Sequence, residues 1–126
     1  MRVGITLKTV RDVARSLPGA AEGLSYQTPA FRVGGKVLCR MHEDGRTLIV
    51  HCDPLERELL LDNNPSVFFV TDLYVHHTWV LVRMETATRP QLEHCLRHAW
   101  RSLGGRGRSP RRRRRVGPAS PRASSI

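Results

Sequence analysis

The segment Pro29-Ala-Phe-Arg-Val-Gly-Gly-Lys-Val-Leu-Cys-Arg-Met41 decides the fold, because two runs of alternating residues flank a two-residue glycine turn. Alternation with a period of two is typical of half-buried strands, and a Gly-Gly pair between two such runs predicts a hairpin. In the first run, Phe31 and Val33 alternate with Ala30 and Arg32. The return run is expected to place Val37, Cys39 and Met41 on one face and Lys36, Leu38 and Arg40 on the other.

Three further runs extend this hairpin into a sheet. Residues 46–52 follow a Glu-Asp-Gly turn and put Leu48 and Val50 on one face, which predicts an antiparallel meander. Residues 67–70 and 78–84 are also apolar, and the polar stretch between them indicates a second hairpin. We therefore expect about five antiparallel strands.

Helix signals separate and flank the strands. Thr6 is a predicted cap for a helix that ends at Pro18-Gly19, and Thr88 with Gln91 predicts a capping box for a last helix. Asp53-Pro54 predicts the start of a middle helix that runs to about Asp62. Its expected buried stripe is Leu55, Leu59 and Leu60. The order α-β-β-β-α-β-β-α predicts an α+β fold whose antiparallel sheet carries its helices on one face.

Charge divides the chain into a predicted folded domain, residues 1–103, and an Arg-rich tail, residues 104–126. Eight of the 21 Lys and Arg residues lie in the tail, which has no acidic residue, so the domain holds 13 basic and 11 acidic side chains. The tail has too few apolar side chains to offset the entropy cost of ordering its backbone, and we expect it to be disordered. The net charge of +10 is thus mostly a property of the tail.

Other features of the composition exclude some classes of protein. No apolar run approaches the ~20 residues that a membrane-spanning helix needs, and the first residues lack the continuous apolar centre of a secretory signal. Three cysteines are an odd number in a domain of this size, which favours free thiols in a reducing compartment. We expect a cytoplasmic protein without a structural disulfide.

Five stretches of the chain form a recognisable set: Leu17-Pro-Gly19, Ser25-Tyr-Gln-Thr-Pro-Ala-Phe-Arg-Val-Gly-Gly-Lys36, Asp53-Pro-Leu-Glu-Arg57, Pro65-Ser-Val-Phe-Phe-Val-Thr-Asp72 and Trp79-Val-Leu-Val-Arg83. Together they resemble the MmcQ/YjbR family over roughly residues 6–103. The resemblance implies a CyaY-like α+β fold with a double-wing arrangement, in a family whose members are commonly described as DNA-binding proteins. Many relatives have Thr-Asp-His-Tyr where this chain has Thr71-Asp72-Leu73-Tyr74, and the tail lies outside the family pattern.

Basic residues on or beside the predicted strands are candidate contacts to the phosphates of duplex or single-stranded DNA. A solvated polar face is the alternative, because the acids of the domain nearly balance its bases. In the tail, consecutive arginines suit strong, salt-sensitive and sequence-independent attachment, although an extension without a selected role stays open. The candidate nucleic-acid-binding residues are Arg32, Lys36, Arg40, Arg46 and Arg83 in the domain, and Arg111, Arg112, Arg113, Arg114 and Arg115 in the tail.

A non-catalytic module that binds a protein or a small ligand is the second hypothesis. It would use the concave side of the sheet, where exposed aromatic side chains form a pocket. The candidate residues of this pocket are Tyr26, Phe31, Asp72, Tyr74 and Trp79.

Metal binding and catalysis have weaker support from the sequence. His94 and His98 are four residues apart on the last helix and could chelate zinc with a third ligand, but the chain has no complete zinc motif. Cys39 and Cys52 are expected to point inward while His51 points the other way, so they form no nucleophile and base pair. We therefore predict a protein that is not an enzyme and has no cofactor or metal.

Overall fold

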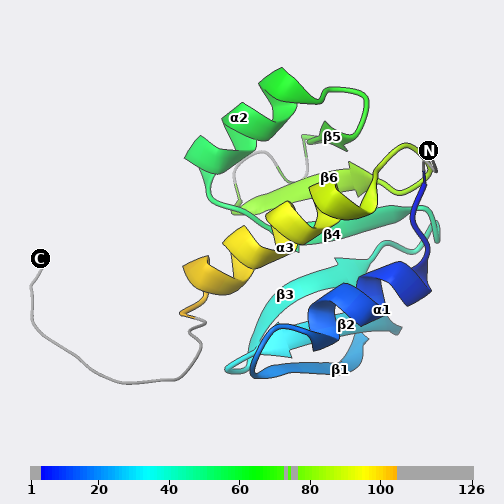
Figure 1. The fold of residues 1–126 in the computed structure, drawn as a ribbon, viewed down its shortest axis with the longest axis vertical. Coiled ribbons are helices and arrows are strands. Elements are labelled where there is room, and N and C mark those ends of the chain that lie inside the picture. Colours follow the sequence, from blue (N-terminus) through cyan, green and yellow to red (C-terminus); the bar gives the residue numbers. More distant parts are fainter. Residues whose placement is uncertain (1–3, 73, 75–76, 105–126) are drawn as a thin grey trace, which may run out of the picture.

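A computed structural model describes residues 4–72, 74 and 77–104 (Figure 1). The fold class predicted from the sequence is confirmed, with three helices and six strands in the described part. The predicted tail lies outside the described residues except for Gly104, so its expected disorder stays a prediction. In chain order the elements are α1 (Leu7–Arg15), β1 (Ala20–Ser25), β2 (Thr28–Val33), β3 (Lys36–Met41), β4 (Thr47–His51), α2 (Pro54–Asn63), β5 (Phe68–Phe69), β6 (Trp79–Arg83) and α3 (Arg89–Ser102).

The strands form one antiparallel sheet in the order β1-β2-β3-β4-β6-β5, with one strand more than the five expected. The additional strand is β1, whose sequence Ala-Ala-Glu-Gly-Leu-Ser has no alternating pattern. The two-residue turn that joins it to β2, Tyr26-Gln27, contains no glycine, yet both residues have positive φ angles of 53° and 66°. Such angles match the turn that two-residue hairpins favour, and the usual Asn-Gly signal is missing from the sequence.

A β-bulge in β3 changes the faces predicted for the central hairpin. Phe31 pairs with Cys39 and Arg32 pairs with Val37, so Leu38 is an extra residue with no direct partner. Leu38 and Cys39 are consequently both buried in the core. The prediction that Leu38 shares the face of Arg40 is therefore wrong, because strict alternation ignores the bulge.

Helices α1 and α3 cover one face of the sheet (Figure 1). Thr6 and Thr88 cap them through the capping-box geometry, as the sequence predicts for Thr88. Five residues of α3 are buried, and the Nε1–H of Trp100 donates to the carbonyl oxygen of Pro18 at 2.8 Å. The cysteines Cys39, Cys52 and Cys95 are free thiols within this core. No helix of the described residues is long and apolar enough to cross a bilayer.

Helix α2 lies beside the β5–β6 end of the sheet rather than over its centre (Figure 1). Asp53 caps it by accepting the N–H of Glu56 at 2.9 Å, as predicted. The predicted leucine stripe is wrong in two of three positions, because Leu55 and Leu59 are 72% and 52% exposed. Packing at an edge buries a narrower strip, which here contains Leu60 and the charged Arg57.

The buried side chain of Arg57 connects α2 to the chain segment that leads into β6. Its Nη1 donates to the carbonyl oxygens of His77 at 2.8 Å and Trp79 at 3.0 Å, and lies 3.4 Å from that of Tyr74. Hydrogen bonds from a charged donor are stronger than neutral ones, and burial raises the cost of losing them. Arg57 therefore holds the backbone carbonyl groups of Tyr74, His77 and Trp79 in place.

We predict that Arg57→Ala lowers the free energy of unfolding by about 3 kcal/mol, because buried carbonyl groups lose their charged donor. Arg57→Lys should recover only part of this loss, since the ammonium of the lysine side chain reaches less far than Nη1 of arginine. Denaturant unfolding of both variants measures the effect. Arg97→Ala, which removes an exposed arginine of α3, is the matched control. Equal stability of Arg57→Ala and the control would contradict the prediction.

Candidate nucleic-acid interface

The sheet face opposite α1 and α3, called the open face below, carries a continuous row of cross-strand partners. The members of the row alternate with core residues along their strands and therefore share the face that points away from the helices. They are apolar except for one cation. Ile49 and Leu81 of the row are only 1% and 3% exposed, so they form an apolar floor. The row runs Ala30 of β2, Arg40 of β3, Ile49 of β4, Leu81 of β6 and Phe69 of β5.

Arg32 and Arg83 of the open face are held by carbonyl groups and a ring instead of carboxylates. Nη1 of Arg32 donates to the carbonyl of Leu24 at 3.2 Å, and Nη1 of Arg83 donates to that of Pro65 at 3.1 Å. The guanidinium of Arg83 also lies 4.2 Å from the ring centroid of Phe69. Carbonyls and rings hold a guanidinium in place without neutralising it. Within the described residues, neither Arg32 nor Arg83 has an ion pair.

Three arginines on the helical side differ in this respect. Arg11 makes a two-pronged contact with Glu22 at 3.0 and 2.9 Å, and Arg15 approaches the same carboxylate at 3.3 Å. Arg89 pairs with Glu93 at 3.0 Å. The charges of Arg32 and Arg83 therefore remain available to an anionic partner. The same is true of Arg97 and Arg101 on α3, which have no ion pair within the described residues, whereas Arg40 of the open face lies 3.7 Å from Glu43.

Two further residues of the predicted basic set lie apart from Arg32 and Arg40. Arg46 is exposed in the β3–β4 turn and lines a shallow depression together with Arg83 and Phe69 and the acidic residues Asp44 and Glu85. Lys36 is the cross-strand partner of Val33, whose side chain is in the core. Because directly opposed residues share a face, Lys36 lies on the helical face of the sheet with Val33. The prediction that Lys36 and Arg40 share a face is therefore wrong. Arg111, Arg112, Arg113, Arg114 and Arg115 lie outside the described residues.

A hollow of about 480 Å³ opens on the open face beside Arg40. Three residues of the predicted pocket line it: Tyr26, Tyr74 and Trp79. Phe31 does not, because it is buried in the core on the helical side, and Asp72 is exposed outside the hollow. Sequence reasoning missed Ile49, His77, His42 and Glu43, which also line it. The pairing of Ile49 with Arg40 would have placed Ile49 there, but its register could not be read without the structure.

Arg40 is the cation of the hollow, and its side chain is 12% exposed. Its guanidinium lies 4.9 Å from the ring centroid of Tyr26, its Nη2 donates to the hydroxyl of Tyr74 at 3.2 Å, and its Nη1 donates to the carbonyl of Met41 at 3.3 Å. Glu43 Oε1 is 3.7 Å away. A guanidinium has five N–H donors, so within the described residues three of them have no hydrogen-bond acceptor.

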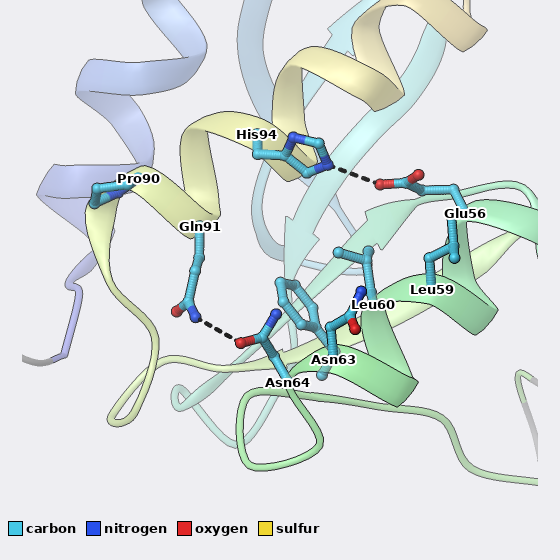
Figure 2. Close-up of a pocket in the computed structure, with 9 residues that line it drawn as sticks. Glu56, Leu59, Leu60, Asn63, Asn64, Pro90, Gln91 and His94 are labelled. Carbon is cyan, nitrogen blue, oxygen red and sulfur yellow. Dashed lines mark hydrogen bonds and ion pairs between the residues drawn. The ribbon is translucent and has the colours of Figure 1, made fainter.

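A second concavity of about 410 Å³ lies between α2 and α3 (Figure 2). Its polar side chains point toward one another across it. Nε2 of His94 is 2.9 Å from Oε2 of Glu56, and Nε2 of Gln91 donates to Oδ1 of Asn64 at 3.2 Å. These contacts hold the two helices together, so this groove offers few free polar groups to a ligand.

The histidine pair of α3 is divided between two carboxylates of α2. His98 Nε2 lies 2.9 Å from Oδ2 of Asp53, whereas His94 faces Glu56. Among the described residues, no group of three or more His, Cys, Asp and Glu side chains could hold a metal ion. The spacing that suggested a chelating pair thus serves two separate contacts between helices.

Comparisons with known proteins agree with this architecture. The described residues form an α+β protein with a six-stranded antiparallel sheet, and none of their helices covers the open face. The sequence pattern of the YjbR family matches residues 15–102, and the chain belongs to the YjbR family. A crystal structure of the Deinococcus radiodurans protein DR2400, with a DUF419 domain, shares the fold with a TM-score of 0.65 and 24% identity over 82% of each chain. No curated protein matches the sequence significantly.

The carboxylate of Asp53 should make stability depend on pH. Its pKa is lowered because it accepts the backbone N–H of Glu56 and contacts His98. A lowered folded-state pKa stabilises the protein above about pH 4 and this contribution is lost as the pH falls through that pKa. Asp53→Asn keeps the cap but removes the charge, so its destabilisation relative to the unmodified chain should shrink between pH 5 and about pH 2.

Chemical denaturation at a series of pH values measures this difference. Asp62→Asn, which changes an exposed acid near the end of the same helix, should show no comparable change with pH. A difference between Asp53→Asn and the unmodified chain that stays constant down to pH 2 would contradict the role given to Asp53.

Proposed function

We propose that this YjbR-family chain is a non-catalytic DNA-binding protein that contacts the phosphate backbone through the open face of its sheet. The Arg-rich segment after Gly104 adds affinity that does not depend on sequence. The observation that carries the proposal is the set of arginines on or beside the open face, Arg32, Arg46 and Arg83, that have no carboxylate partner within the described residues. Free guanidinium groups are the usual ligands of phosphate.

The form of the contact also fits weak binding without sequence preference. Phosphate contacts position a protein on DNA, but they carry no sequence information. The folded part has few cations in excess of its acids, so its own affinity should be modest. Eight arginines without an acid in residues 105–126 suit release of counterions from DNA, which gives strong dependence on salt.

Burial of the thiols supports a binding role over a catalytic one. Burial raises the pKa of Cys39 and of Cys52 to about 12, and it raises the pKa of Cys95 well above its ordinary value. A catalytic cysteine needs an accessible thiolate near neutral pH. These three side chains serve as small apolar residues of the core.

Binding to a labelled DNA duplex over a series of salt concentrations tests the proposal. The full chain and a chain ending at Gly104 are compared, each with and without Arg32→Gln/Arg83→Gln. We expect the shorter chain to bind more weakly but measurably. The double substitution should reduce the slope of log affinity against log salt by up to about two in both chains, because each lost phosphate contact removes nearly one unit.

A matched control is Arg15→Gln/Arg89→Gln, which removes the same charge from arginines that are paired with Glu22 and Glu93. Its salt slope should stay close to that of the unmodified chain. If the chain ending at Gly104 is folded and binds no DNA, the open face has no role and binding belongs to the tail alone.

The hollow beside Arg40 favours a second candidate function, a module for a small anionic ligand with an aromatic ring. Its volume of about 480 Å³ lies within the ~300 to 1,000 Å³ of typical ligand sites, and it combines an apolar floor with a cation. We expect stabilisation in a thermal-shift series with nucleoside monophosphates, rising with ligand concentration and lost in Arg40→Gln. No shift with any nucleotide, together with clear DNA binding, would reject this candidate.

A further inference from the structure

Tyr26 is exposed to an unusual degree for a large aromatic side chain of this domain. Its exposure is 78%, although aromatic rings contribute most to stability when they are buried. Its backbone is also strained, because φ is 53° at Tyr26 and 66° at Gln27, and side chains other than glycine rarely adopt such angles. Strained residues that persist in an exposed turn are often retained for function. The turn therefore holds a ring in solvent at an energetic cost.

Arg40 fixes the place of that ring beside the hollow. The guanidinium lies 4.9 Å from the ring centroid of Tyr26 and bonds the hydroxyl of Tyr74 at 3.2 Å. Trp79 lines the same hollow, and its ring meets that of His51 edge to face at 5.9 Å between centroids. Aromatic rings of β1–β2 and of the chain leading into β6 thus surround one concave space with a cationic side chain inside it.

This arrangement matches the shape and chemistry of a nucleobase. A base presents a flat π face for stacking on an aromatic ring and a polar edge for hydrogen bonds. Ile49 offers an apolar floor that is 1% exposed, and Arg40 offers N–H donors to the ring nitrogen or carbonyl oxygen of a base edge. In a duplex the faces of the bases are stacked and their edges are paired, so only an unpaired base can enter.

We propose that the hollow binds an unpaired base, so that the open face prefers single-stranded DNA to duplex. This inference rests on the proposed function, because Arg32 and Arg83 lie on the same face of the sheet as the hollow and would contact other phosphates of the bound strand. Single-strand-binding proteins commonly combine a cationic surface with aromatic side chains on which bases stack. Arg57 is a positioning residue here, since it holds the backbone of Tyr74, His77 and Trp79.

The test compares the binding of the full chain to a single-stranded thymidine 12-mer and to a 12-base-pair duplex. Tyr26→Asn removes the ring while asparagine tolerates the positive φ, so the hairpin is kept. We expect its affinity for the single strand to fall roughly tenfold or more, with duplex binding nearly unchanged. Tyr26→Phe should retain binding, because stacking needs the ring rather than the hydroxyl.

Leu24→Asn is the matched control, because it changes an exposed apolar residue of the same hairpin that does not line the hollow. Equal losses for single strand and duplex in Tyr26→Asn, or no loss for either, would overturn the inference while leaving the proposed function standing. If the unmodified chain binds neither form of DNA, the proposed function fails and the inference fails with it.

Discussion

The packing of α3 against the centre of the sheet is the constraint on which the rest of the structure depends. Its buried stripe covers β3 and β4, and the bond from Trp100 to the carbonyl of Pro18 ties the same helix to the end of α1. One layer of helices covers one face, and the chain has no second layer within the described residues. The opposite face therefore combines the apolar side chains of its row with arginines, and the guanidinium of Arg83 lies over the ring of Phe69.

Two arginines, Arg57 and Arg40, have different roles at the hollow of the open face. Arg57 of α2 donates hydrogen bonds to the backbone carbonyl groups of Tyr74, His77 and Trp79 and so holds that backbone in place. Arg40 rises from β3 into the hollow that this backbone helps to form. The buried guanidinium of Arg57 holds the backbone on one side of the hollow. The guanidinium of Arg40 supplies hydrogen-bond donors inside it. The residue that holds this side of the hollow, Arg57, thus does not itself line the hollow.

Ion pairs divide the arginines of the domain into two groups. Carboxylates neutralise Arg11, Arg15 and Arg89 on the helical side, while Arg32 and Arg83 keep their charge because their acceptors are carbonyl groups. A nearly balanced composition therefore does not tell which arginines keep an unpaired charge. That depends on which side chains meet in space and not on how many there are.

Local patterns in the sequence determined the fold class, the caps at Thr88 and Asp53, the central hairpin and the family, because caps and alternation depend on residues within a few positions of each other. Tertiary structure alone decided the rest. The bulge at Leu38, the strand without a pattern before Tyr26, and the burial of Arg57 in place of Leu55 and Leu59 arise from pairing and packing between distant segments. The same holds for the hollow, where three predicted residues meet, whereas Phe31 turns to the core because its strand alternates away from the open face.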